Sequence, residues 1–377
     1  MGDRGRTSAS LIFFMLHSLT HVRAAFEALG GLPIPAIHIS GSKGKGTTAF
    51  LLAKIIELSG DRVGLFSSPA IMDETEMIQV NSCRIPSDRL FALKEKIAVL
   101  DPSLTEFELQ TLAAFEYFKE ENCDFVVLEC GWGGREDATN VIENKALTLV
   151  THIELEHADV LGPTLTDIVK HKLGIHRAGV PLLTPVQQCS ELFEELNCMG
   201  ISPLLSPQMA LGFHHPESAG LAVMAAELLG YSLDSVIEKA LVECVIPGRF
   251  EILPFGPHTL ILDGAHTYDS VKFVLERVLD YQREKGLPDP YFGVHFLRDK
   301  NPELPDLFPL HRTFWIPLED ERAGKKPDPL QEMPLPEILE RLKNTALPEL
   351  WLFVGSFKLV AKVKDLQASL PDGFFRS

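Results

Sequence analysis

The chain has 377 residues, of which 45% are hydrophobic and 23% charged, and these proportions are those of a globular protein rather than a disordered one. Because this length exceeds what one hydrophobic core usually serves, we expect two domains, residues 1–250 and 251–377. The formal net charge of −17 argues against non-specific binding to nucleic acid and to an anionic membrane surface. No stretch is long enough to span a bilayer, so we expect a cytoplasmic protein, and we expect it to be a monomer.

Two further features concern the N-terminus and the thiols. A short apolar run at residues 11–16 follows two arginines, but His17 ends it and no cleavage pattern follows. We therefore interpret the run as a helix that docks on the first domain rather than as a signal peptide. None of the six cysteines has C-x-x-C spacing, and most lie in apolar runs, so we expect reduced core thiols rather than disulfides or a zinc site.

A glycine-rich turn separates an apolar run at 36–40 from residues 50–56, whose apolar spacing predicts a helix packed on a sheet. A strand, such a turn and a helix N-terminus together form an anion site, because the turn can wrap round a phosphate and the first helical N–H groups point at it. Lys45 would neutralise terminal phosphates, and Thr47 offers a hydroxyl to a magnesium ion. The turn is shorter than the common G-x-x-x-x-G-K-[ST], and a turn that binds nothing is the alternative. The expected phosphate-binding residues are Gly41, Ser42, Lys43, Gly44, Lys45, Gly46, Thr47 and Thr48.

Strands and helices alternate through the rest of the first domain, which predicts a P-loop ATPase-like, doubly wound parallel sheet with its site at the carboxyl ends of the strands. The expected strands are 62–68, 124–130, 146–153 and 180–186. The expected helices are 87–100, 109–119, 165–178, 219–229 and 233–242. Thr105 and Glu108 have the spacing of a capping box ahead of the second of these helices. Residues 70–86 are expected to be irregular.

The alternation restarts after Pro247-Gly248-Arg249. We expect a second, smaller Rossmann-like α/β domain, with strands at 260–262, 291–296, 314–317 and 351–354 and helices at 270–283 and from 357. The proline-rich, charged stretch 318–337 is expected to be a surface loop, and we find no internal repeat.

Three polar residues end or follow strands of the first domain, at the edge where an open α/β sheet binds its ligands. They are Ser68, Glu129 and His157. A hydroxyl, a carboxylate and an imidazole can hold Mg²⁺ beside a P-loop, together with phosphate oxygens and water. Taken singly, the serine is a turn residue, the carboxylate a helix cap and the histidine a packing residue, but their common place favours a metal site.

Longer motifs extend this pattern in order along nearly the whole chain. They are HISGSKGKGT (38–47), SSP (67–69), FE (107–108), LECGWGGR (128–135), DATNV (137–141), EH (156–157), LG (161–162), KLGI (172–175), PGR (247–249), DGAH (263–266), DK (299–300) and GSF (355–357). On these residues the chain resembles the folylpolyglutamate synthase/dihydrofolate synthase family, a branch of the Mur ligase superfamily.

The resemblance implies a ligase that uses ATP and Mg²⁺, with two ions expected, to join L-glutamate to a folate or pteroate carboxylate through an acyl phosphate. It implies that Lys45 and Arg249 bind the γ-phosphate, and that Asp263 and His266 meet the ribose and phosphates of ATP. Since the P-loop and Asp263 would meet on one nucleotide, it also implies domain closure. The metal ligands that it implies are Ser68, Glu129 and His157, with Thr47 as an addition.

Lys172 occupies the place of a lysine that is carbamylated in the family and lies at the second metal. An unmodified ammonium there would repel Mg²⁺, whereas a carbamate offers a carboxylate-like ligand. The resemblance therefore implies that Lys172 is carbamylated, and the alternative is a solvated helical lysine.

The sequence departs from the family pattern around the expected site, which leaves nucleotide choice open. The departing residues are Lys43, Ala70, Glu156, His215, Ser218, Thr267 and Tyr268. These departures support one alternative function, that of a catalytically silent paralogue that binds nucleotide or folate. Another Mur-type ligase would need a nucleotide-sugar-binding domain, for which the roughly 35 residues before the P-loop strand are too few. A P-loop kinase would not require Asp263 and His266. Whether the acceptor is dihydropteroate, a reduced folate or both also stays open.

Overall fold

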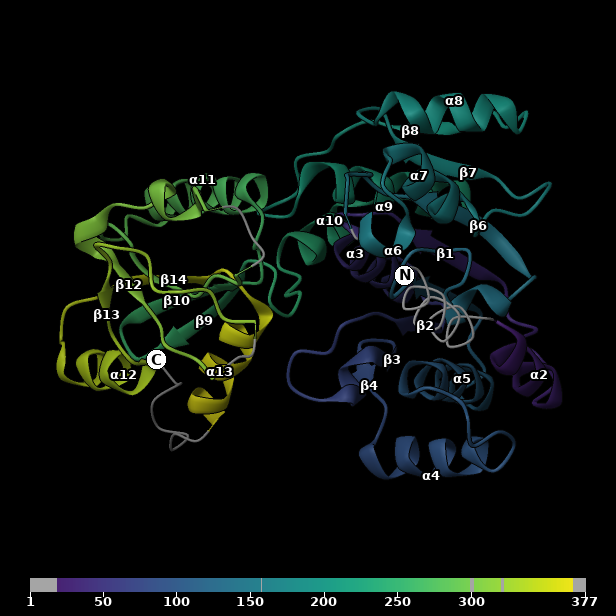
Figure 1. Cartoon of the computed structure of the whole chain (residues 1–377), viewed down its shortest axis with the longest axis horizontal. Helices are drawn as coiled ribbons and strands as arrows, with labels where there is room; N and C mark the ends of the chain where they lie inside the picture. Colours follow the sequence, from purple (N-terminus) through teal and green to yellow (C-terminus); the bar gives the residue numbers. More distant parts are fainter. Residues whose placement is uncertain (1–18, 157, 299–301, 320–321, 369–377) are drawn as a thin grey trace, which may run out of the picture. The chain divides into compact units, whose positions relative to one another are not determined.

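The computed structural model describes residues 19–156, 158–298, 302–319 and 322–368, which divide into two compact units between Cys244 and Val245 (Figure 1). The expected domain boundary at residue 250 lies a few residues after this division. The expected N-terminal helix at 11–16, His157 and the DK motif at 299–300 lie outside the described residues.

An eight-stranded sheet forms the centre of the first unit, in the order β4-β3-β2-β5-β1-β6-β7-β8. The strand β1 lies in the middle and pairs in parallel with β5 on one side and β6 on the other. The parallel, doubly wound sheet expected from the sequence is thereby confirmed. The strands are β1 (Ala36–Ser40), β2 (Val63–Phe66), β3 (Ile78–Val80), β4 (Cys83–Arg84), β5 (Phe125–Glu129), β6 (Lys145–Val150), β7 (Leu182–Pro185) and β8 (Leu204–Ser206).

Helices cover both faces of this sheet. One face packs on α2, α4 and α5 in a core that includes Phe66, Phe115 and Val126. Because strand side chains alternate between faces, the neighbouring buried strand residues point to the other side, where α3 and α9 pack. The helices of this unit are α2 (Thr20–Ala28), α3 (Lys45–Leu58), α4 (Ser87–Ala98), α5 (Glu106–Glu120), α6 (Ala158–Leu161), α7 (Leu165–Leu173), α8 (Ser190–Cys198), α9 (Pro216–Leu228) and α10 (Ser235–Val242), with short 3-10 helices η1 (Glu74–Met77) and η2 (Ala138–Val141).

The prediction that residues 70–86 are irregular is wrong for part of this stretch. The strand β3 pairs antiparallel with β2, and β4 returns antiparallel along β3. Asn81 and Ser82 connect them with positive φ angles of 46° and 60°, which is the backbone of a tight hairpin turn. Three residues of β3 and two of β4 are too short for an alternating pattern to stand out in the sequence.

The capping box before α5 is present as expected. The Thr105 side chain accepts a hydrogen bond from the Glu108 N–H, and the Glu108 carboxylate accepts one from the Thr105 N–H at 2.7 Å. Both bonds satisfy N–H groups that a helix start would otherwise leave without partners.

Replacing Thr105 by alanine is expected to lower the free energy of unfolding by about 1 kcal/mol, because the N-cap acceptor is lost while the helix face is unchanged. Urea unfolding followed by circular dichroism measures this. Thr105→Ser keeps the hydroxyl and is the control, with a midpoint close to that of the wild type. An equal loss in both variants would show that the methyl group, and not the cap, is responsible.

A six-stranded sheet forms the second unit, in the order β13-β12-β11-β14-β10-β9. It is parallel except for β9, which pairs antiparallel with β10. The expected surface loop at 318–337 is wrong in its last part, because this part contains β13 at Gln331–Glu332 and the start of α12, which begins at Leu335 and buries four leucine and isoleucine side chains. The elements are β9 (Glu251–Phe255), β10 (His258–Asp263), β11 (Tyr291–Val294), β12 (Thr313–Trp315), β13 (Gln331–Glu332), β14 (Leu350–Val354), α11 (Tyr268–Lys285), α12 (Leu335–Asn344), α13 (Phe357–Ala368), and the 3-10 helices η3 (Leu304–Leu307) and η4 (Leu310–Arg312).

The six cysteines are free, but only Cys123 and Cys130 are buried, so the expectation of core thiols holds for these two alone. In the part of the chain that the structure describes, no helix is both long and hydrophobic enough to cross a membrane.

Candidate active site

The glycine-rich turn joins β1 to α3, as expected of a P-loop. Gly41 has φ 137°, and a Cβ atom there would lie 2.0 Å from Thr151 Oγ1, at the end of β6. Gly44 takes a left-handed conformation with φ 87° as the N-cap of α3, and a Cβ there would lie 2.6 Å from Ser218 Oγ. Only glycine fits both places, so the backbone itself can approach a ligand closely.

Two lysine ammonium groups meet at this turn. Lys45 donates to the carbonyl oxygens of Gly41 at 3.0 Å and Ser42 at 3.3 Å. Lys172, in the last turn of α7, donates to the same Gly41 oxygen at 2.8 Å. Two cations on one carbonyl, beside the free N–H groups that begin a helix, favour an anion with several oxygens.

Lys172 is nearly buried, since its side chain is only 2% exposed. Burial lowers the pKa of Lys172 to about 8, and repulsion from Lys45 acts in the same direction. Its ammonium pairs with Glu156 at 2.8 Å. Burial acts to raise the pKa of Glu156, but the charges of Lys172 and Lys45, together with hydrogen bonds from Lys172 and Ser42, hold that pKa below its usual range. The solvated lysine considered as the alternative for Lys172 is therefore wrong.

Glu129 ends β5 and lies beside the first turn of α3. Its Oε2 accepts hydrogen bonds from Ser67 Oγ at 2.6 Å and from the Ser68 N–H at 3.1 Å. A Cβ on Gly46 would lie 3.3 Å from the same oxygen, so the carboxylate sits directly against the P-loop helix. Glu129 is only 4% exposed, and these two serines orient its carboxylate.

These oxygen donors fit a magnesium ion. Glu129 offers a carboxylate, and the hydroxyls of Thr47 and Ser68 belong to the two segments that flank it. Among the described residues no group of three or more His, Cys, Asp or Glu side chains is arranged so that it could hold a metal ion by itself. Mg²⁺ does not need such a group, because it usually keeps waters and binds one or two carboxylates together with substrate phosphates. His157, the third expected ligand, lies outside the described residues.

The departing residue Lys43 is paired rather than free. Its ammonium lies 2.6 Å from Glu154 Oε1, and Ser42 Oγ exchanges hydrogen bonds with the Glu154 backbone. The N–H groups of Ser42 and Lys43 both donate to His152 O. Residues 152–154, which follow β6, therefore hold Ser42 and Lys43 of the P-loop in place. Ser218 points at Gly44 O, at 3.4 Å, where it supports the turn.

The second unit holds the remaining expected residues close together. Asp263, at the end of β10, accepts from the N–H groups of Phe250 and Ala265, both at 2.7 Å. Burial raises the pKa of Asp263, while Arg249 and these two N–H groups act to lower it. Arg249 lies over the Phe357 ring at 4.3 Å, and His266 Nδ1 is 2.9 Å from Gly264 O. Asp263 thus fixes the loop that carries Arg249, which sequence reasoning did not foresee.

The structure brings Lys45, Glu129, Lys172 and the backbone of Ser68 to one P-loop. It also shows two residues that sequence reasoning missed. Ser67 orients Glu129, and Glu156 pairs with Lys172. The serine pair at 67–68 was visible in the sequence, but only the structure shows which hydroxyl reaches the carboxylate.

No family model matches the chain. The chain is 32% identical over 290 residues to the dihydrofolate synthase/folylpolyglutamate synthase of Bacillus subtilis, a match that covers 64% of this chain and 67% of that protein. The chain belongs to the folylpolyglutamate synthase/dihydrofolate synthase family. This confirms the resemblance read from the motifs, and members of this family are ligases that form carbon–nitrogen bonds.

Solved structures of this family share the fold. Escherichia coli FolC in complex with DHPP and ADP superposes with a TM-score of 0.77 at 26% identity, over 93% of both chains. A folylpolyglutamate synthase/dihydrofolate synthase from Yersinia pestis, complexed with AMPPNP and a Mn ion, gives a TM-score of 0.79 at 24% identity, again over 93% of both chains. At 24% identity, the similarity to the Yersinia pestis structure shows only that the two proteins share a fold.

Proposed function

We propose that this member of the folylpolyglutamate synthase/dihydrofolate synthase family uses ATP to join L-glutamate to the carboxylate of a folate or pteroate. The observation that carries this proposal is the convergence of Lys45, Lys172 and Glu129 on one P-loop. Such a site suits phosphoryl transfer, in which the protein aligns the phosphates and neutralises their charge rather than supplying a nucleophile.

The reaction has two steps. A carboxylate oxygen of the acceptor attacks the γ-phosphorus of ATP, so an acyl phosphate forms and ADP leaves. The amine of glutamate then attacks the acyl carbon, and a tetrahedral intermediate collapses to the amide as inorganic phosphate leaves and the amine loses its proton. We assign Lys45 to the γ-phosphate, where its charge offsets the charge of the transferring group. The P-loop N–H groups would hold the neighbouring phosphates.

We propose that Glu129, the hydroxyls of Ser68 and Thr47, and His157 hold Mg²⁺, which when bound supplies positive charge to the phosphate oxygens. Ser67 and the Ser68 N–H hold the Glu129 carboxylate in one orientation. We further propose that Arg249, Asp263 and His266 bind ATP. A second ion, a monomeric state, and action in the cytoplasm, where ATP is supplied, are also parts of this proposal.

We propose that Lys172 is carbamylated in the active enzyme. Carbon dioxide adds only to the neutral amine, and at pH 7.5 a pKa of about 8 leaves about a quarter of the amine neutral, against about one part in a thousand for an ordinary lysine. The carbamate would lie beside Glu156, and only a cation could stabilise two such anions together.

With ¹³C-labelled bicarbonate, the wild type is therefore expected to show a carbamate carbon signal that Lys172→Arg lacks. Lys172→Ala should lose most activity and regain part of it with added short carboxylates. Lys170→Arg, two residues away and paired with Glu195 on the surface, is the control and should keep the signal. A wild type without any carbamate signal at saturating bicarbonate would leave Lys172 as an ammonium group.

The acceptor is tested by measuring phosphate release with Mg-ATP and glutamate while dihydropteroate and tetrahydrofolate are supplied separately. Release that depends on one of them identifies the acceptor. If no phosphate is released with either acceptor although ATP binding is measurable, the alternative of a catalytically silent paralogue is favoured. The departures at Lys43 and Ser218 had indicated this alternative.

A further inference from the structure

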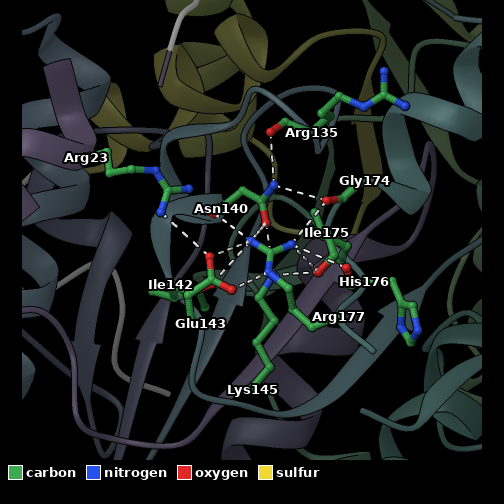
Figure 2. Close-up of polar contacts among 10 residues, drawn as sticks. All are labelled: Arg23, Arg135, Asn140, Ile142, Glu143, Lys145, Gly174, Ile175, His176 and Arg177. Atoms are coloured by element: carbon green, nitrogen blue, oxygen red, sulfur yellow. Dashed lines mark hydrogen bonds and ion pairs between the residues drawn. The ribbon is translucent and has the colours of Figure 1, made fainter. Parts of the chain in front are cut away.

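Asn140, in η2, forms the centre of a buried polar network (Figure 2). Its Nδ2 donates to the carbonyl oxygens of Arg135 at 2.9 Å and Gly174 at 3.1 Å. Its Oδ1 accepts from Lys145 Nζ at 2.9 Å and Arg177 Nη2 at 3.2 Å. A primary amide has two donor hydrogens and two acceptor lone pairs, so all four are used and the orientation of the amide is fixed.

The two carbonyls that Asn140 joins belong to segments that carry site residues. Arg135 ends the glycine-rich turn that follows Glu129, and Gly174 follows Lys172 at the end of α7. The segments are in close contact, because a Cβ on Gly134 would lie 2.7 Å from His171 O and one on Gly174 would lie 2.5 Å from Arg135 Cβ. The Arg135 N–H also donates to His171 O at 2.9 Å.

Two basic side chains, Arg177 and Lys145, bind the segment that follows α7 (Figure 2). Arg177 donates to the carbonyls of Gly174 at 3.3 Å and His176 at 3.3 Å, and its Nε pairs with Glu143 at 2.6 Å. Lys145, the first residue of β6, donates to Ile175 O. These hydrogen bonds hold the carbonyls of residues 174–176, directly after α7, and the positive charge of Arg177 stabilises the carbonyl end of the helix.

We propose that Asn140 is a positioning residue for the ligase reaction, which holds the end of α7 against the turn after Glu129 and so sets where Lys172 and Glu129 meet the P-loop. This inference rests on the proposed function. Asn140 is 3% exposed and touches neither the P-loop nor Lys172 Nζ through any described hydrogen bond, so it acts through the backbone of both segments.

Loss of the amide donors would remove the Asn140 hydrogen bond from the Arg135 carbonyl and leave the Gly174 carbonyl with Arg177 as its remaining side-chain donor, which would loosen the contact between the segments. A shift of about 1 Å in a group that acts on the transferring phosphate lowers the rate strongly, while the binding of ATP to an unchanged P-loop is affected little. Replacing a residue that orients such groups typically costs about 10- to 100-fold in activity.

The test uses the full chain with Asn140→Ala and Asn140→Asp. The aspartate keeps the size of the side chain and an acceptor for Lys145 and Arg177, but it lacks the two N–H donors. Asn144→Ala is the matched control, because Asn144 lies four residues on and donates instead to Pro33 O at 2.7 Å. Three experiments are made: steady-state kinetics, which give kcat and KM for ATP; the melting temperature; and the rate at which a lysine-acylating reagent modifies Lys172 at a fixed pH in bicarbonate-free buffer, where the lysine carries no carbamate, read by peptide mass.

Both Asn140 variants are expected to lose about 10- to 100-fold in kcat with a nearly unchanged KM for ATP. In both, the reagent is expected to acylate Lys172 several-fold faster than in the wild type. The control should match the wild type in all three. Should Asn140→Ala fail to fold, Asn140→Asp decides the question. The proposal is overturned if the variants keep the wild-type kcat and the wild-type rate of Lys172 acylation. It is also overturned if kcat falls only in proportion to the melting temperature, while the rate of Lys172 acylation stays unchanged. A wild type that lacks ligase activity, but whose Lys172 is protected by Asn140, would refute the proposed function and leave the attachment of α7 standing.

Discussion

Lys45→Ala is expected to lower kcat for ligation by roughly 10³-fold or more, which is the size of effect seen when a charged group aimed at a transferring phosphoryl group is removed. Lys45 lies within the P-loop and donates to the carbonyls of Gly41 and Ser42, so its ammonium already occupies the turn that would receive the phosphates. Alanine keeps the helix, since it has the highest helix propensity. Acceptor-dependent phosphate release, measured at saturating substrates, gives the change.

The control for Lys45→Ala is Lys54→Ala in the same helix, because the Lys54 ammonium pairs with Glu57 and donates to Ser82, neither of which belongs to the P-loop. It should retain wild-type turnover, and both variants should unfold at similar urea concentrations. Near-normal turnover in a folded Lys45→Ala would remove the P-loop from the proposed site.

The second large effect is expected for Glu129→Gln. The amide has the shape of the carboxylate but no charge, so the ion that the site is proposed to hold loses its one buried carboxylate among the described ligands. A metal near a transferring phosphate is worth several kcal/mol, and each 1.36 kcal/mol is tenfold in rate, so we expect a loss of about 10²- to 10³-fold. Turnover measured against Mg²⁺ concentration should also show a higher requirement for the ion.

Glu120→Gln is the matched control for this substitution, because Glu120 pairs with Arg89 on the surface of the same unit. It should leave both turnover and the magnesium requirement unchanged. If Glu129→Gln showed the magnesium dependence of the wild type, Glu129 would be a structural acceptor for Ser67 and Ser68 and not a ligand.

The fold was predictable from the sequence where local signals agreed. The apolar runs of β1, β5 and β6 and the capping box of Thr105 and Glu108 all lie where the pattern placed them. The hairpin β3–β4 was missed because β3 is held by pairing with β2 and β4 by pairing with β3, which no local pattern reveals. The start of α12 was missed because prolines surround it, although Pro336 lies within the first turn, where proline is tolerated.

The candidate site was predictable only in part. The P-loop turn carries its own signal in the glycines, and the acid after β5 marks the sheet edge. By contrast, the meeting of Lys172 with Gly41 joins residues 131 positions apart, and the network of Asn140 depends on contacts between a turn and the end of a helix. Residue types alone cannot specify such contacts, because many arrangements of the same elements would satisfy the same local preferences.

The most direct test of the central claim is to supply an acceptor whose carboxylate carries ¹⁸O, with Mg-ATP and glutamate, and to record the masses of both products. With both carboxylate oxygens labelled, ligation through an acyl phosphate predicts a glutamylated product that keeps one ¹⁸O atom in its new amide carbonyl, and one ¹⁸O atom in each inorganic phosphate released. Hydrolysis of ATP without a glutamylated product, or phosphate that carries no ¹⁸O, would contradict the account.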